Sequence, residues 1–324
     1  MATYNGTSGS DLIKGSALAD IINGLAGCDS LYGLAGNDVI NGGAGDDFLS
    51  GGDGNDTLIG GSGYNDLHGG AGLDTFTMSS RIGAVFSDDL VYDMTDGDLI
   101  DVSAWGISDF SQIQAIMGFN YFGAAIDAYY NGVHHVLSFA GVAPWQFEFD
   151  DFVYSTAPGG TQTGTALQDV LFGSTGADTL NGGASRDKLL GGLGNDTLNG
   201  GTGDDDLIGG AGRDVMTGGT GLDWFVYDNA SETGIGVARD LITDFVKGQD
   251  KIDLWDVDAK SGVSGNQAFA WIGTASSFTA AGQLRYAQSG GNTVIFGNTD
   301  ADSAAEFEIQ LTGNITLSAS DFFL

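Results

Sequence analysis

The chain has 324 residues, and its 43 acidic and 10 basic side chains give a formal net charge of −33. A field of that sign attracts cations and excludes nucleic acid and anionic membrane surfaces as partners. We expect no membrane insertion, because no run of about 18 apolar residues exists, and the N-terminus does not resemble a signal peptide. The single cysteine, Cys28, excludes an internal disulfide. Since 42% of the residues are apolar, the charge does not indicate disorder.

Nonapeptide repeats occupy residues 6–77, eight of them without a gap, and residues 164–226, seven more. Glycine stands at position 1 of all fifteen, and position 6 is aspartate in all except one, where Asn65 stands. Position 8 is apolar throughout and lies between two variable residues. This pattern predicts a six-residue loop followed by a very short strand whose central side chain points inward.

The loops carry the residue types of a calcium site. Glycine permits positive φ and lets backbone carbonyl groups come close together. Carbonyl oxygens and a carboxylate are hard ligands, which Ca²⁺ prefers. The alternative is a metal-free array of glycine turns. The sequence favours calcium bound between loops, with these aspartates as its ligands: Asp11, Asp20, Asp29, Asp38, Asp47, Asp56, Asp74, Asp169, Asp178, Asp187, Asp196, Asp205, Asp214 and Asp223.

The consensus G-G-x-G-x-D-x-U-x resembles the nonapeptide of the RTX (repeats-in-toxin) calcium-binding proteins. The resemblance implies two parallel β-rolls with two repeats per turn, and calcium between the loops of repeats n and n+2. A strand this short is unstable alone, so stacked repeats must bury their position-8 side chains together. Leu18, Leu167 and Ser185 replace the glycine at position 4, and with Asn65 they predict weaker or absent sites.

Two non-repeat segments follow the repeat blocks and resemble each other. "LVYDMTDGDLIDVSAW" at 90–105 parallels "LITDFVKGQDKIDLWDV" at 241–257. Apolar and polar residues alternate at 145–150 and at 307–311, which predicts half-buried strands. We therefore expect an all-β chain built as a duplicated module, in which each β-roll is followed by a β-rich capping domain. The expected parts are a first roll at 1–77, a first cap at 78–157, a linker and second roll at 158–226, and a second cap at 227–324.

The second cap is similar to the C-terminal domain of serralysin-type secreted metalloproteases, through "DLITDFVKGQDKIDL" and the final Asp321-Phe322-Phe323-Leu324. An acidic residue followed by three apolar residues resembles that family's type I secretion signal, although an ordinary final strand is the alternative. The resemblance implies a bacterial protein that is extracellular or at the cell surface, with the type I secretion machinery as a partner. Calcium-poor cytosol would keep the chain loose, and calcium would fold it on exit.

No catalytic motif is found in the sequence, so we expect no enzyme. The chain has three histidines and lacks the H-E-x-x-H pattern of zinc proteases. His134 and His135 are adjacent, so on a strand they face opposite sides and cannot bind one metal ion, while His68 occupies a variable repeat position. The G-x-S-x-G pattern of serine hydrolases is also missing.

Three functions remain open at this point. The first is a self-associating structural protein of an extracellular layer, filament or biofilm matrix. The second is a calcium-dependent carbohydrate-binding module for a cell-surface polysaccharide, resembling the R-modules of alginate epimerases. That module would need a basic or aromatic groove. Its candidate aromatics, for which packing in the core is the commoner role, are Trp105, Tyr121, Phe122, Tyr129, Tyr130 and Trp145. The third is an enzyme of unrecognised type, which no feature of the sequence supports.

Overall fold

A computed structural model of the chain describes residues 1–78, 86–95, 97–107, 110–120, 122–130, 133–144, 152–153 and 159–324. The chain forms two compact units, Met1–Ser155 and Thr156–Leu324. The strand predicted at 145–150 lies outside the described residues, and so does residue 158, where the predicted linker begins. Among the described helices, none combines the length and apolar character that crossing a bilayer requires.

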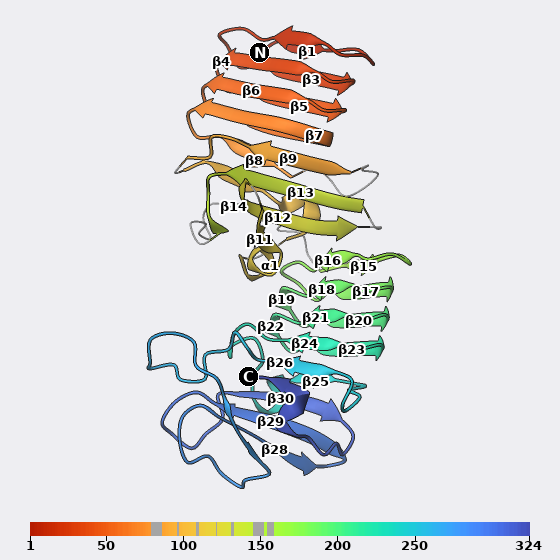
Figure 1. Cartoon of the computed structure of the whole chain (residues 1–324), viewed down its shortest axis with the longest axis vertical. Coiled ribbons are helices and arrows are strands. Elements are labelled where there is room, and N and C mark those ends of the chain that lie inside the picture. Colours follow the sequence, from red (N-terminus) through yellow and green to blue (C-terminus); the bar gives the residue numbers. More distant parts are fainter. Residues whose placement is uncertain are drawn as a thin grey trace. The chain divides into compact units, whose positions relative to one another are not determined.

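The first unit begins with a roll of two parallel sheets (Figure 1). One sheet contains β1 (Thr3–Asn5), β3 (Ile21–Ala26), β5 (Val39–Ala44), the first part of β7 (Thr57–Ala71) and β8 (Thr75–Thr77). The other contains β2 (Leu12–Lys14), β4 (Ser30–Ala35), β6 (Phe48–Asp53) and the second part of β7. Equivalent residues pair at a spacing of two repeats, as in Ile22 with Ile40 and Ile40 with Leu58.

The core of the first roll consists of the position-8 side chains of both sheets. Ile22, Leu31, Ile40, Leu49 and Leu58 have no exposed surface. Because the flanking residues at positions 7 and 9 point outward, each strand contributes one apolar side chain to the space between the sheets. Each such burial stabilises the fold by about 1.5–3 kcal/mol. Stacking of repeats therefore supplies the core that no single repeat could form.

The first cap extends both sheets of its roll. One extension is β9 (Ser87–Val91), followed in space by β13 (Val133–Ala140), β12 (Gly123–Tyr130) and β11 (Met117–Phe119). The other is β10 (Leu99–Asp101), which lies between β8 and β14 (Phe152–Val153). The described helical segments of this cap are the 3₁₀ turn η1 (Ser103–Trp105) and the single-turn α1 (Phe110–Gln114).

The second unit repeats this plan. One sheet of its roll contains β15 (Thr161–Thr163), β17 (Thr179–Ala184), β20 (Thr197–Thr202) and β23 (Val215–Thr220). The other contains β16 (Val170–Phe172), β18 (Lys188–Leu190), β21 (Asp206–Ile208) and β24 (Trp224–Val226). Two loops also form a short pair, β19 (Leu193–Gly194) with β22 (Ala211–Gly212).

The second cap again extends both sheets. β25 (Asp240–Ile242) continues to β30 (Phe307–Thr312), β29 (Asn292–Asn298), β28 (Gln283–Ser289) and β27 (Ala270–Gly273). β26 (Lys251–Asp253) continues to β31 (Phe322–Phe323). Short 3₁₀ turns, η4 (Gly236–Ala238) and η5 (Ala319–Asp321), lie in the connections.

The all-β fold with parallel rolls is confirmed. Both units end with the same arrangement, since Phe152 pairs with Ile100 in the first and Phe322 pairs with Ile252 in the second. β14 and β31 thus supply equivalent strands, and β31 belongs to the tail Asp321-Phe322-Phe323-Leu324 that the sequence singled out. The origin of this likeness in a duplicated module stays a prediction.

Candidate calcium-binding loops

Each repeat loop folds around the glycine at position 1. A Cβ atom at Gly33 would overlap Oδ2 of Asp38, from the same repeat, and the carbonyl oxygen of Gly51, two repeats further on. The equivalent overlap occurs at Gly24 with Asp29 and Gly42. A carboxylate oxygen and a carbonyl oxygen therefore converge on a space that only glycine leaves open.

The aspartates form a hydrogen-bonded ladder along each edge of the rolls. From the third repeat of each roll onward, Oδ1 of the aspartate accepts the backbone N–H of the aspartate two repeats earlier. Asp20 donates to Asp38 at 2.7 Å, and Asp38 donates to Asp56 at 2.8 Å. In the second roll, Asp187 donates to Asp205 at 2.8 Å. The ladder occupies Oδ1 of these carboxylates, so Oδ2 is the oxygen that can face a ligand.

In eight repeats, Oδ2 is buried and has no hydrogen-bond partner among the described residues: Asp29, Asp38, Asp47, Asp56, Asp187, Asp196, Asp205 and Asp214. A buried carboxylate oxygen without a partner is strongly unfavourable. A cation relieves this, and hard oxygen donors of this kind fit Ca²⁺. The residues present therefore fit a calcium ion held between loops by carboxylate and carbonyl oxygens.

The comparison with family models agrees with this geometry. The model described as RTX calcium-binding nonapeptide repeat matches four times, at residues 5–40, 15–49, 24–58 and 50–77. The model described as Peptidase M10 serralysin C terminal matches residues 176–324. The chain carries RTX calcium-binding repeats and a serralysin-type C-terminal region. The resemblance predicted from the sequence is confirmed, and calcium is the ion that RTX repeats bind.

Solved structures give weaker likenesses. The AlgE6R3 subunit of the mannuronan C5-epimerase of Azotobacter vinelandii is 24% identical over 53% of this chain and 81% of that chain, with a TM-score of 0.34. The AlgE6R2 subunit of the same enzyme is 26% identical over 49% of this chain and 92% of that chain, with a TM-score of 0.32. Extracellular lipase LipA of Serratia marcescens is 15% identical, with a TM-score of 0.30, and covers 92% of this chain and 40% of that chain. No curated protein matches the chain.

The carboxyl groups of the RTX loops are electrostatically perturbed. Burial, with smaller effects of neighbouring carboxylates, raises the pKa of Asp187, Asp196, Asp214 and Asp223 to about 7. Burial likewise raises the pKa of Asp47, Asp56 and Asp205 to about 6. Asp20 differs, because a hydrogen bond from the Ser16 hydroxyl lowers its pKa. A divalent cation in the loops would oppose the upward shifts by favouring the charged form.

The predicted ligands do not all have the same environment. Asp74 and Asp223, in the last repeat of each roll, lie against the position-1 glycines Gly69 and Gly218 in the same way as the eight. In four others, Asp11, Asp20, Asp169 and Asp178, Oδ2 accepts hydrogen bonds from its own loop. The role of the fourteen as metal ligands therefore stays a proposal, strongest for the eight with unpaired oxygens.

The ladder continues into the caps, which the sequence analysis missed. Asp74 donates to Asp98 Oδ1 at 2.8 Å, and Asp214 donates to Asp240 Oδ1 at 2.8 Å. Asp250 accepts in the same way from Asp223, and Oδ2 of Asp240 is buried and unpaired. Each of these cap aspartates stands two residues before a buried apolar residue, which is the spacing of aspartate and apolar residue in the repeats. This spacing could have predicted them from the sequence, although no glycine loop precedes them.

A second pair of cap residues closes the last loops of the RTX rolls. The carboxylate of Asp93 accepts the N–H groups of Gly69 and Gly70 at 2.9 and 3.1 Å. Asp244 accepts those of Gly218 and Gly219 at 3.0 and 2.8 Å. These N–H groups lack a following repeat to bind, so the carboxylates terminate the stack in the same manner in both units.

Asn65 marks the interrupted repeat of the first roll. Its Oδ1 accepts the N–H of Asp47 at 3.0 Å, and its Nδ2 donates to Asp89 Oδ1 at 2.7 Å. Its repeat still carries the chain from one sheet to the other, since the first part of β7 pairs with β5 and the second part with β6, although the strand runs unbroken through it. The amide satisfies this place in the ladder without a cation. That its site is weak or absent stays a prediction.

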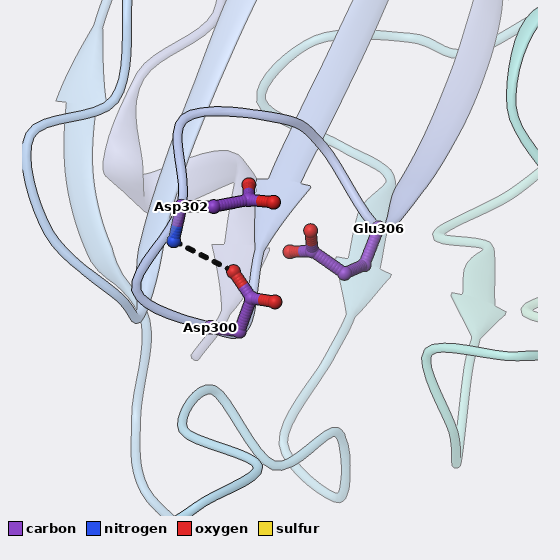
Figure 2. A group of neighbouring side chains, drawn as sticks. All are labelled: Asp300, Asp302 and Glu306. Carbon is purple, nitrogen blue, oxygen red and sulfur yellow. Dashed lines mark hydrogen bonds between the residues drawn. The ribbon is translucent and has the colours of Figure 1, made fainter.

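A further acidic group lies outside the repeats, in the loop between β29 and β30. Figure 2 shows Asp300, Asp302 and Glu306 with their carboxylates directed toward one another. Asp300 Oδ1 accepts the N–H of Asp302 at 2.8 Å, and Glu306 accepts that of Thr299 at 2.6 Å. Among the described residues, this is the single group of three acidic, histidine or cysteine side chains with metal-ligand spacing. The RTX loops do not form such groups, because each supplies one carboxylate and several carbonyl oxygens.

The histidines of the first cap lie on opposite faces of β13, as predicted. His134 Nε2 lies 2.6 Å from Asp127 Oδ1 at the surface. His135 is buried, and its Nδ1 lies 2.9 Å from Ser87 Oγ. This serine and histidine have the spacing of a nucleophile and its base, but both are almost fully buried, which denies them a substrate.

Proposed function

We propose that this chain is a non-catalytic, secreted structural protein that folds on Ca²⁺ outside the cell and then self-associates into an extracellular layer, filament or matrix. The observation that carries the proposal is the set of eight buried, unpaired Oδ2 atoms in the RTX loops. Without a cation, the folded rolls would hold all of these oxygens unsatisfied, so folding and calcium binding form one equilibrium.

The C-terminal tail supports the link to secretion. Asp321 and Phe322 are buried, and Phe322 pairs with Ile252 in the terminal sheet. A transport machine that reads this tail would therefore meet it only in the unfolded chain. Low cytosolic calcium keeps the chain in that state, and extracellular calcium sites with dissociation constants near 10⁻⁴–10⁻³ M would fold it after export.

The N-terminal turn of the first roll supports self-association. Among the described strands, β1 pairs with β3 alone and β2 with β4 alone. Leu12 and Leu18 in this turn are 68% and 67% exposed. Unpaired strand edges beside exposed apolar side chains are a template for another chain. We propose that this turn receives a second copy of the protein.

The test combines a calcium titration with imaging. We expect circular dichroism to show β-structure only with millimolar Ca²⁺, and negative-stain images to show filaments or sheets under the same conditions. Leu12→Lys with Leu18→Lys should abolish assembly and leave calcium-dependent folding intact. Leu222→Lys, at an exposed leucine of the second roll, is the matched control. A wild-type chain that stays monomeric in calcium at high concentration would rule out self-association.

A second candidate function, binding of an acidic polysaccharide, is favoured by one surface feature. A cavity of about 410 Å³ in the second unit is lined by Arg213, Arg239 and Gln310. Arg239 already forms an ion pair, since its Nη1 lies 3.0 Å from Oε2 of Glu308. Two arginines in one cavity are notable in a chain with 10 basic residues, and guanidinium groups suit carboxylate ligands.

The aromatic residues give this candidate less support. Trp105 is fully buried and belongs to the core, and Tyr121 and Trp145 lie outside the described residues. His68 of the first roll and Tyr92 of the first cap stack on each other at 4.7 Å, which covers one face of each ring. Retention on an immobilised polyuronate in calcium, lost in Arg213→Ala but kept in Arg186→Ala, would support this second function.

A further inference from the structure

The RTX loops fall into two classes that differ at position 2 of the repeat. Four loops, which we call closed, have Thr7, Ser16, Thr165 or Ser174 there, and none of these residues has a positive φ. The eight loops with unpaired Oδ2 atoms, which we call open, have glycine or leucine there, always with a positive φ. The closed loops are the first two of each roll.

In a closed loop, the position-2 residue satisfies the carboxylate by itself. Ser16 donates its N–H to Asp20 Oδ2 at 2.8 Å and its hydroxyl to the same oxygen at 2.7 Å. Thr165 does the same for Asp169 at 2.7 and 3.0 Å. Asp11 and Asp178 receive the equivalent pairs of bonds from Thr7 and Ser174. Two donors thus meet the oxygen that is unpaired in the open loops.

In an open loop, the left-handed backbone at position 2 leaves Oδ2 without these donors. Gly43 and Gly201 adopt this conformation with φ values of 103° and 108°. Leu25 and Leu34 adopt it with φ values of 78° and 84°, although a left-handed residue with a Cβ costs about 1–2 kcal/mol. The open conformation is thus kept even at leucine, for which it is unfavourable. This indicates that the unpaired Oδ2 atom of these loops has a role as a ligand.

We infer that the hydroxyl and N–H of position 2 replace calcium in the closed loops, so that Asp11, Asp20, Asp169 and Asp178 are not calcium ligands. Each roll then starts with a metal-independent turn and continues into calcium-dependent ones. The first cap ends its roll similarly, because Thr95 donates its N–H and hydroxyl to Asp98 Oδ2 at 2.7 and 2.9 Å. This inference rests on the proposed calcium-dependent folding, and it narrows the fourteen predicted ligands to ten.

The test counts bound ions in the full chain. A variant with Asp11→Asn, Asp20→Asn, Asp169→Asn and Asp178→Asn is compared with one carrying Asp38→Asn, Asp47→Asn, Asp196→Asn and Asp205→Asn. By equilibrium dialysis with elemental analysis, the closed-loop variant should bind as many calcium ions as the wild type. The open-loop variant should lose ions, up to four. Loss of two or more ions from the closed-loop variant would overturn the inference.

Single substitutions guard against misfolding of the fourfold variants. Asp20→Asn and Asp178→Asn should each leave the number of bound calcium ions unchanged. Asp38 and Asp196 are the ladder partners of these two aspartates, two repeats further on and in open loops. Asp38→Asn and Asp196→Asn should each lower the number by about one ion. Equal losses from both pairs would contradict the inference. A wild-type chain that binds no calcium would instead remove the proposed function itself, so the two failures are distinct.

Discussion

The two units join roll to cap in different ways at the same point, the next-to-last repeat. In the first unit, the amide of Asn65 donates to Asp89 Oδ1, and both side chains are buried. In the second, the pair is Asp214 and Asp240, and each keeps a buried Oδ2 atom without a partner. The surrounding ladder is otherwise alike, since Asp47 donates to Asn65 and Asp196 donates to Asp214.

The difference teaches that a hydrogen-bond donor and a cation can satisfy the same place in this fold. Asn65 carries its own donor and needs no metal, whereas two charged carboxylates at this depth are unfavourable until a cation binds or a proton neutralises them. The second unit therefore depends more strongly on calcium, and the comparison can be tested by changing the ion, the core and the pair itself.

Removal of calcium should have the largest effect. In excess chelator we expect both rolls to lose most of their β-structure, and as free calcium falls the second unit should open first. Hydrogen exchange followed by mass spectrometry can assign the opening to repeats in each unit. Magnesium is the control and should not restore protection, because it prefers fewer protein ligands and a smaller, octahedral site. Simultaneous opening of both units would erase the contrast.

Core truncation should rank next. Leu49 and Leu198 occupy position 8 in the two rolls and have no exposed surface. At saturating calcium, Leu49→Ala and Leu198→Ala should each lower the free energy of unfolding by about 2–5 kcal/mol, because each leaves a cavity between the sheets. Urea unfolding of each variant measures the change. Substitution of the exposed Leu73, as Leu73→Ala, should stay near the wild type.

Exchange of the junction residues should have a smaller effect of opposite sign in the two units. Asp214→Asn supplies an amide donor, so the second unit should lose about one ion and tolerate lower calcium. Asn65→Asp removes the donor beside Asp89, so the first unit should become less stable at limiting calcium, by roughly 1–3 kcal/mol, and gain an ion at saturating calcium. Dialysis and thermal unfolding report both quantities. If both variants gained ions, or both lost ions, the proposed difference between the two junctions would be contradicted.

The smallest effect should be the pH dependence of the calcium-free protein. Burial raises the pKa of Asp187, Asp196, Asp214 and Asp240 to about 7, from an ordinary value of 3.8. Between these values the native state binds more protons than the unfolded state, so its stability falls as pH rises toward 7. In chelator we expect more structure at pH 5 than at pH 8, chiefly in the second unit. Circular dichroism across this range checks the sign.

The sequence by itself determined the repeating part of this protein. A period of nine with glycine, aspartate and an apolar residue in fixed places dictates the loop, the strand and the core, because these are local choices that stacking merely repeats. It also indicated calcium, since the ligand type is encoded in the residues. Leu31 and Leu198 were predictable as core residues for the same reason, and both are fully buried.

Only the tertiary structure decided which carboxylates are left unpaired. Asp20 and Asp38 occupy the same position of two different repeats, yet one is satisfied by Ser16 and the other is not. Asp240 joined the ladder although no glycine loop precedes it. These outcomes depend on where donors from elsewhere in the chain come to lie and on the sign of φ at one loop position. Hydrogen bonding is directional and short in range, so a pattern of residue types cannot fix it until the backbone is in place.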